Sequence, residues 1–101
     1  MRLLSSTDRA TITSVTPPST KSWIGQTVEL KCVAHGVPTP VLTWIKPDGN
    51  DIKKVTATEN VVNVAMKEDK DFGLYTCQAE NIVGGACKRT MEVKQISKLV
   101  S

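Results

Sequence analysis

The chain has 101 residues and a net charge of +3, from 13 Lys and Arg residues against 10 Asp and Glu residues. That length holds one domain with a substantial core but not two. The basic residues are scattered without interleaved aromatic residues, which argues against a nucleic-acid platform, and no run approaches the roughly 20 apolar residues of a membrane-spanning helix.

The two ends of the chain lack the pattern of the middle. The first ten residues, MRLLSSTDRA, contain only a two-residue apolar patch, which is too short for the core of a signal peptide. We therefore interpret residues 1–8 and 96–101 as flanking segments around one domain at residues 9–95.

Short runs with the period of a β-strand begin after the first flanking segment. Residues 10–15 alternate and stop near a pair of prolines. Residues 27–34 place their apolar side chains on one face, and residues 41–46 lead into the turn sequence PDGN. The first half of the chain therefore predicts three strands.

Three further strands are predicted at residues 60–66, 74–80 and 86–94. Residues 51–59 are polar and weakly patterned, so we assign no strand there. No long window has helical periodicity. Strands at intervals of about 8–12 residues, with turn residues between them, predict an all-β sandwich or barrel.

Two cysteines, a tryptophan and a tyrosine stand at an informative spacing. Trp44 lies 12 residues after Cys32, Cys77 lies 33 residues after Trp44, and Tyr75 lies two residues before Cys77. The segments Gly-x-Pro-x-Pro at 36–40 and Cys-x-Ala-x-Asn-x-x-Gly at 77–84 accompany them. In these motifs the chain resembles the immunoglobulin superfamily over residues 9–95, and within it the intermediate, or I-set, class.

The resemblance implies an immunoglobulin-like Greek-key β-sandwich of two antiparallel sheets. Cys32 and Cys77 would face one another from opposite sheets and form a disulfide, Trp44 would cover it, and Leu30 would lie in the same core. In the chain-entropy model, closing a loop of about 45 residues contributes roughly 4 kcal/mol to stability.

The same resemblance implies a tyrosine corner at Tyr75, whose hydroxyl would bond to the backbone a few residues upstream. Asp71 and Gly73 would shape the bend that leads into this strand, Gly73 by adopting backbone angles that a side chain forbids. Lys53 or Lys54 would supply the basic partner that the aspartate often has in related domains.

Cys87 is left over from the disulfide pair, and two interpretations of it stay open. It is a free thiol packed as a small apolar side chain on the inner face of the last strand. Alternatively, it takes part in redox exchange, by competing for the disulfide or by pairing with another chain.

No cofactor, metal site or catalytic site is expected. His35 is interpreted as a lone histidine in a turn, and Glu68, Asp69 and Asp71 as a solvated loop rather than as calcium ligands. The chain has no Ser-His-Asp arrangement, no glycine loop for a phosphate, and no histidine beside a thiolate. We therefore expect a protein that is not an enzyme.

Candidate contact residues lie at the two ends of the predicted sandwich. Ile82 and Val83 stand at the tip of the hairpin between the last two strands, beside the loop that contains Pro38. At the opposite end, Trp23 either offers a large aromatic surface or tucks under the edge of the first strand. Both ends are therefore candidate contact surfaces.

These features predict a protein–protein recognition module of a multidomain cell-surface adhesion molecule or receptor, with homophilic or heterophilic contacts. Its partners would be neighbouring immunoglobulin or fibronectin modules and an adhesion partner or ligand, without nucleic acid. The membrane would be reached only through regions outside this fragment. The disulfide pair indicates an oxidising, extracellular location.

Two alternatives stay open. One is a structural module of an intracellular, titin-like sarcomeric filament in the cytoplasm, where the cysteine pair can remain reduced. The other is a secreted matrix or growth-factor-receptor module that binds a protein or polysaccharide ligand. For the latter, Lys88, Arg89 and Lys94 would form a modest basic stripe.

Overall fold

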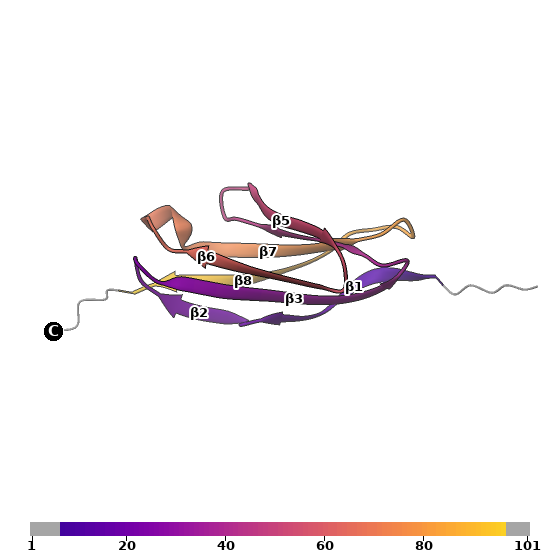
Figure 1. Cartoon of the computed structure of the whole chain (residues 1–101), viewed down its shortest axis with the longest axis horizontal. Coiled ribbons are helices and arrows are strands. Elements are labelled where there is room, and N and C mark those ends of the chain that lie inside the picture. The colour runs from indigo at the N-terminus through magenta and orange to yellow at the C-terminus, as the bar shows by residue number, and fades with distance from the viewer. Residues whose placement is uncertain (1–6, 97–101) are drawn as a thin grey trace, which may run out of the picture.

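The computed structural model describes residues 7–96, and within them it contains eight β-strands and one short 3-10 turn (Figure 1). The turn, η1, covers Asp69–Asp71. The strands are β1 Asp8–Thr16, β2 Ser19–Ser22, β3 Thr27–Val37, β4 Val41–Ile45, β5 Asp51–Thr56, β6 Glu59–Ala65, β7 Gly73–Glu80 and β8 Cys87–Gln95.

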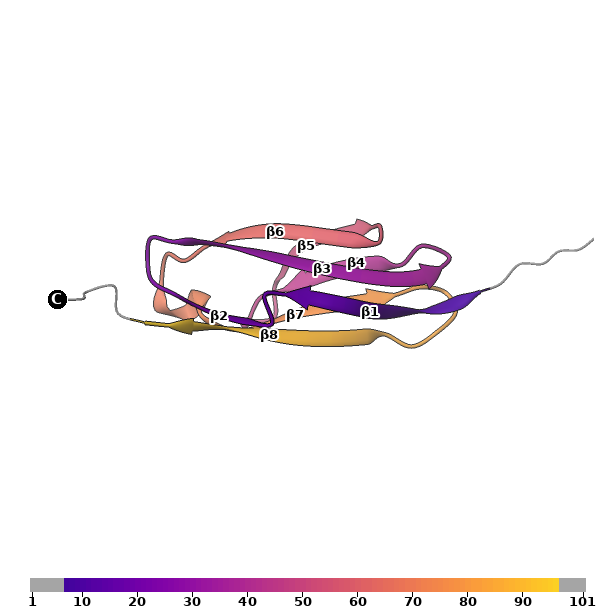
Figure 2. The same ribbon diagram turned by 90° about the horizontal axis from the view of Figure 1, so that it is seen from below.

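The strands form two sheets that pack face to face (Figures 1 and 2). One sheet has three strands in the order β1-β3-β6, and the other has five in the order β2-β8-β7-β4-β5. Every pair is antiparallel except β2 with β8, which is parallel. The two-sheet, all-β sandwich expected from the sequence is confirmed.

The chain changes sheets between β1 and β2. Strand β1 pairs with β3 in the three-stranded sheet, whereas β2 pairs with β8 in the five-stranded sheet. Pro17 and Pro18 lie at the crossing, where the chain has no ladder to complete and a missing backbone N–H costs nothing. The first segment of the chain therefore closes one edge of both sheets.

All six predicted strands are present, with ends displaced by at most three residues. Two strands, β2 and β5, escaped the sequence analysis because both are sheet edges with mostly exposed or half-buried side chains, which gives no clean alternation. The prediction of a turn at His35 was wrong, because β3 runs on to Val37 and holds this exposed side chain within the strand.

The core lies between the sheets and takes side chains from both. In β3, Leu30, Cys32 and Ala34 are buried while the residues between them face outward or are only half-buried. The other buried apolar residues are Ala10, Ile12, Val15, Leu42, Trp44, Val62, Met66, Tyr75, Cys77, Ala79, Met91 and Val93.

The described part of the chain has no helix long and apolar enough to cross a membrane.

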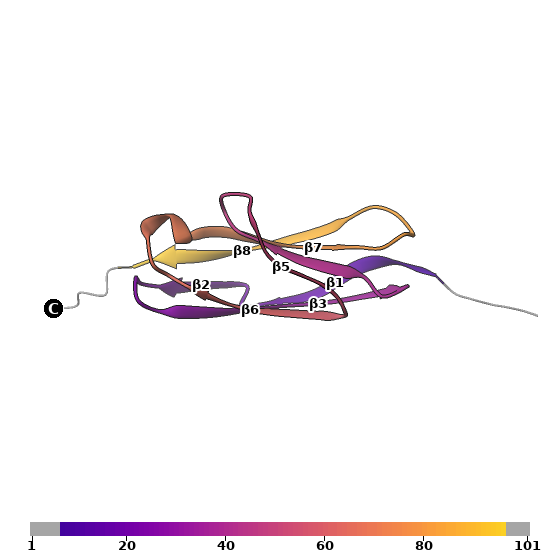
Figure 3. The ribbon, with the colours of Figure 1, turned by 45° about the horizontal axis from the view of Figure 1, so that its top comes forward.

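The opposite edge of the sandwich is closed only in part. Strands β5 and β6 lie in different sheets, yet only Ala57 and Thr58 separate them in the chain (Figure 3). The crossing is anchored on both sides, since Ala57 N–H donates to Pro40 O at 3.0 Å and Ala34 N–H donates to Thr58 O at 2.8 Å. Away from this crossing the two strands diverge.

Candidate functional site

The centre of the sandwich is a disulfide between Cys32 on β3 and Cys77 on β7. Its Cα atoms are 6.4 Å apart, and neither cysteine is exposed to solvent. The bridge joins the two sheets and confirms the expected pair. Trp44 is also wholly buried, and its indole N–H donates to Asn60 O at 2.9 Å, so the one polar atom of this side chain is satisfied.

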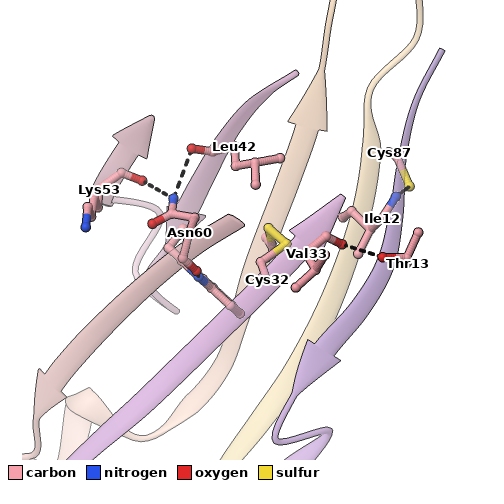
Figure 4. The surroundings of a disulfide bond; sticks show 10 residues. Ile12, Thr13, Cys32, Val33, Leu42, Lys53, Asn60 and Cys87 are labelled. Atoms are coloured by element: carbon pink, nitrogen blue, oxygen red, sulfur yellow. Dashed lines mark hydrogen bonds between the residues drawn. A yellow bond between two sulfur atoms is a disulfide. The ribbon is translucent and has the colours of Figure 1, made fainter. Parts of the chain in front are cut away.

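Asn60 is a second inter-sheet tie, on β6. Its amide nitrogen donates to Leu42 O on β4 at 3.0 Å and to Lys53 O on β5 at 3.1 Å (Figure 4). The amide oxygen is buried without a partner among the described residues. Sequence reasoning missed this residue, although the inward alternation of Val62 and Val64 extends back to it.

A tyrosine corner forms where η1 leads into β7. The buried Tyr75 hydroxyl donates to Asp71 O, four residues upstream. Burial, followed by the negative charges of Asp71 and Asp48, raises the pKa of Tyr75 to about 12, so the phenol keeps the proton that it donates. The corner expected from the sequence is therefore present with its hydrogen bond made.

The Asp71 side chain holds the same bend from the other side. One carboxylate oxygen accepts the backbone N–H of Lys67 at 2.7 Å and of Glu68 at 2.9 Å. Burial alone would raise the pKa of Asp71, but these two donors, together with the charges of Lys46 and Lys70, hold it below its usual value of 3.8. The aspartate is therefore ionised and structural.

The prediction that Lys53 or Lys54 is the basic partner of Asp71 was wrong. Lys53 instead donates from its ammonium group to Val61 O at 3.2 Å, and the cations that act on Asp71 are Lys46 and Lys70. Gly73 follows with a φ of +136°, where a Cβ would lie 3.3 Å from the Pro47 ring. Both its backbone angle and its surroundings therefore favour glycine.

The end of the sandwich where β1 begins, which we call the N-terminal pole, consists of residues 36–40 and 81–86 together with Asp8. Asn81 ties these segments together, because its amide nitrogen donates to Asp8 O at 2.8 Å and to Pro38 O at 3.0 Å. Its amide oxygen accepts the N–H of Val83 at 3.2 Å. A Cβ at Gly36 would come within 3.1 Å of Asn81 and Ala10.

Apolar side chains project from this clamped pole. Ile82 is 89% exposed and Val83 is 40% exposed at the tip of the β7–β8 hairpin. Val37, the last residue of β3, and Pro38, on the loop that follows it, are also exposed. The structure thus brings together three of the predicted contact residues, Ile82, Val83 and Pro38, and adds Val37, which sequence reasoning did not single out.

Trp23 belongs to the other end, the C-terminal pole, which we define as residues 22–26 and 66–72. It is half-buried, while its neighbour Ile24 is 46% exposed. Gly25 N–H donates to Met66 O and Met66 N–H donates to Gln26 O, both at 2.8 Å, so the two loops of this pole are joined by backbone. The fourth predicted contact residue is therefore separated from the other three.

Cys87 lies on β8, one strand away from the disulfide. Its side chain is half-buried, and its sulfur accepts the N–H of Ile12 on β1 at 3.5 Å (Figure 4). In the β7–β8 ladder its partner is Ala79 rather than Cys77. The structure therefore holds Cys87 as a free thiol against β1.

The predicted basic stripe is divided by the strand register. Arg89 pairs with the inward Cys77, and Lys88 pairs with Gln78 on the outer face. Lys94 is also on the outer face, opposite Lys21 of β2. Arg89 is exposed at the edge beside β1, so the three side chains do not share one surface.

Within residues 7–96 no three His, Cys, Asp or Glu side chains gather as a potential metal site. His35 is an exposed strand residue that belongs to no such group. The Asp69 carboxylate accepts a hydrogen bond from the Gln95 side-chain amide at 2.8 Å. The side chains of Asp71 and Asn81 bind backbone groups at the two poles.

Comparison with known proteins agrees with this architecture. Residues 11–81 match a family model described as an immunoglobulin domain. Over 68 residues the chain is 37% identical to Contactin-2 of Rattus norvegicus, covering 67% of this chain and 6% of that protein. Over 72 residues it is 36% identical to vascular endothelial growth factor receptor 2 of Mus musculus, covering 67% of this chain and 5% of that protein. The chain thus spans a small fraction of these relatives.

Among solved structures, a complex of titin M10 with an obscurin-like 1 immunoglobulin domain superposes with a TM-score of 0.73. The alignment covers 92% of this chain and 99% of the other, at 23% identity, and it shows a shared fold. The buried Cys32–Cys77 bridge, the Tyr75 corner, the two-sheet topology and the family match lead to one conclusion: the chain belongs to the immunoglobulin domain family.

Proposed function

We propose that this domain is a non-enzymatic recognition module that binds another protein through its N-terminal pole. The observation that carries the proposal is Ile82, which is 89% exposed at the tip of a hairpin. An isoleucine held almost completely in water gains free energy when a partner covers it, on the order of 1.5–3 kcal/mol for the side chain.

The clamp beneath the tip supports the same proposal. Asn81 fixes the tip to Asp8 and Pro38 by two hydrogen bonds, so little backbone freedom remains for a partner to remove. Association is weakened by the ordering of loops, and a contact surface that is already ordered avoids that loss. Val83, Val37 and Pro38 surround Ile82 and widen the apolar area.

The parent protein that we infer is a multidomain cell-surface adhesion molecule or receptor, in which residues 9–95 form one module. The disulfide supports an oxidising, extracellular location. The similarity to a contactin and to a growth factor receptor supports the same class. Partners would then be adjacent modules or the ectodomain of another protein.

The test is a binding screen with the domain immobilised on beads. Soluble ectodomains of cell-surface proteins, and the domain itself, are presented to the wild type and to Ile82→Ser. We expect at least one ectodomain to bind the wild type and to lose binding at least about tenfold on Ile82→Ser, because the central apolar contact is removed.

Leu74→Ser is the matched control, because Leu74 is 56% exposed on β7, outside both poles. Binding that survives Ile82→Ser but fails with Leu74→Ser would move the contact to the outer face of the five-stranded sheet. A screen with no ectodomain that distinguishes Ile82→Ser from the wild type would contradict the proposal.

One observation favours a second candidate, a module of an intracellular filament protein. Cys87 is a free thiol next to a disulfide pair, and free thiols are usual in a reducing compartment. Alkylation of the natively purified chain in denaturant, followed by mass spectrometry, separates the candidates. One free thiol at Cys87 supports the extracellular module, and three free thiols after exposure to an oxidant support the filament module.

A further inference from the structure

A cleft of about 350 Å³ opens at the edge of the sandwich where β5 and β6 diverge. The two-residue crossing between these strands and the Asn60 tie close the edge near one end. Lys46, at the start of the turn at 46–50, and residues of the segment 67–71 line the cleft away from this crossing. This volume lies within the range of about 300–1,000 Å³ that is usual for small ligand sites.

The walls of the cleft are apolar where the two sheets face each other. Ile52 enters from β5 and Val64 from β6, and both side chains are only half-buried. Val64 is at an inward position of its strand, opposite Val28 in the ladder, and it packs against the core while part of its side chain stays exposed. The cleft therefore offers room and contact area for one apolar side chain.

The rim of the cleft is basic. Lys46, Lys67 and Lys70 line it together with two carboxylates, those of Glu68 and Asp71. Both carboxylates already have partners: Glu68 lies 3.8 Å from the Lys70 ammonium group, and Asp71 accepts two backbone N–H groups. Among residues 7–96, no hydrogen bond or ion pair engages the ammonium groups of Lys46 and Lys67.

Both lysines stand on fixed backbone, and the Lys46 charge also acts on Asp71 without forming an ion pair with it. Lys46 N–H donates to Asn50 O at 2.8 Å, and Gly49 N–H donates to Lys46 O at 2.9 Å. Lys67 N–H donates to the Asp71 carboxylate at 2.7 Å. The neighbouring Asp48 is outside the cleft wall, and its carboxylate accepts the N–H of Asn50 at 2.9 Å.

From this arrangement we propose that the cleft binds an acidic peptide segment of a partner protein, with an apolar side chain between Ile52 and Val64 and an adjacent carboxylate between Lys46 and Lys67. The apolar contact offered by Ile52 and Val64 favours a peptide over a sulfated polysaccharide, which binds along an extended basic surface. The site is distinct from the N-terminal pole and does not depend on the function proposed for it.

The test uses nuclear magnetic resonance of the whole ¹⁵N-labelled chain. The probe is an end-blocked leucyl-glutamate dipeptide, and end-blocked leucyl-glutamine is its neutral counterpart. We expect saturable shifts of the Ile52, Val64 and Lys67 amides, with a dissociation constant of roughly 0.1–1 mM. The neutral dipeptide should bind at least about threefold more weakly, because it loses an exposed charge pair.

A pair of double variants with equal charge change gives the control. Lys46→Gln with Lys67→Gln should weaken the acidic dipeptide at least about threefold, whereas Lys54→Gln with Lys88→Gln, both exposed outside the cleft, should leave its affinity unchanged. Thermal unfolding establishes that all variants are folded.

Four results would overturn the proposal. The first is equal affinity for the acidic and neutral dipeptides. The second is equal weakening by the two double variants, which would indicate attraction by net charge alone. The third is displacement of the dipeptide by a sulfated disaccharide that binds more tightly, which would assign the cleft to a polyanion. The fourth is the absence of saturable shifts at the Ile52, Val64 and Lys67 amides.

Discussion

The two poles of this sandwich are built from the same kind of element, a polar side chain that binds backbone, but with opposite results at the surface. At the C-terminal pole the Asp71 carboxylate accepts two N–H groups and is itself buried. At the N-terminal pole the Asn81 amide donates to two carbonyl groups, and Ile82 beside it stays in water. One tie stabilises a corner, and the other presents a surface.

The difference follows from the chemistry of the two side chains. A carboxylate accepts hydrogen bonds only, and N–H groups that bind a charged acceptor do so more strongly than a neutral pair. An amide both donates and accepts, so Asn81 joins three segments at a modest energy for each bond. We therefore expect the Asp71 tie to matter more for stability, and the Asn81 tie to matter more for contacts made by Ile82 at the N-terminal pole.

The largest effect should come from the disulfide that joins the two sheets between the poles. Cys32→Ala with Cys77→Ala removes a bridge across 45 residues and should lower the free energy of unfolding by about 4 kcal/mol. Urea unfolding measures it. Cys87→Ser, which leaves the bridge intact, is the control and should cost less than about 1.5 kcal/mol, because this thiol is half-buried. A disulfide effect no larger than the control would show that packing alone joins the sheets.

The second-largest effect on the free energy of unfolding should come from Asp71. Asp71→Ala leaves two N–H groups without their charged acceptor and should lower the free energy of unfolding by about 2–3 kcal/mol. Asp71→Asn keeps an acceptor oxygen but loses the charge, so it should fall between the wild type and Asp71→Ala. Equal stability of all three proteins would contradict the role given to this side chain.

The direction of the Asp71 pKa shift predicts how the stability of the protein changes with pH. The pKa of Asp71 is lower in the folded state than its usual value of 3.8, so the unfolded chain takes up the proton first as the pH falls. The stabilising contribution of Asp71 is therefore fully present above the unfolded-state pKa of 3.8 and is lost as the pH falls through the lower pKa of the folded state. Asp71→Asn should show a flatter decline of stability over this acidic range.

The smallest effect on stability should come from Asn81. Asn81→Ala removes three neutral hydrogen bonds at a half-buried position and should lower the free energy of unfolding by about 1 kcal/mol. Amide hydrogen exchange should speed up at Val83 and leave the Asp71 corner unchanged. Protection lost equally at both poles would mean that the two ends do not behave as separate units.

The sequence predicted the parts of the molecule that have a strong pattern. Cys32, Trp44 and Tyr75 stand at fixed spacing, and the inward side chains alternate in β3, β7 and β8, so six strands and the disulfide were foreseen. Strand β5 was missed because it is an edge and because a register shift at Ile52 breaks the period of two, so that its half-buried apolar residues, Ile52 and Val55, are three positions apart. The edge cleft was missed with it.

The sites were harder to foresee than the strands. Nothing local in the sequence says that Asn81 reaches Asp8, 73 positions away, and only the fold brings them together. The partner of Asp71 was misassigned for a similar reason, because whether Lys46 or Lys53 faces the corner depends on how the turn at 46–50 folds back. Contacts across loops are set by tertiary packing rather than by periodicity.

The parallel pairing of β2 with β8 has a mechanical consequence. The described chain enters at the N-terminal pole, where Asp8 meets Asn81, and leaves at the C-terminal pole, where Ile96 N–H bonds to Ser22 O at 2.9 Å. A pulling force on the two ends would therefore slide β2 and β8 past each other in opposite directions. Such shear loads the whole row from Ser19 to Ser22 at once instead of opening it one bond at a time.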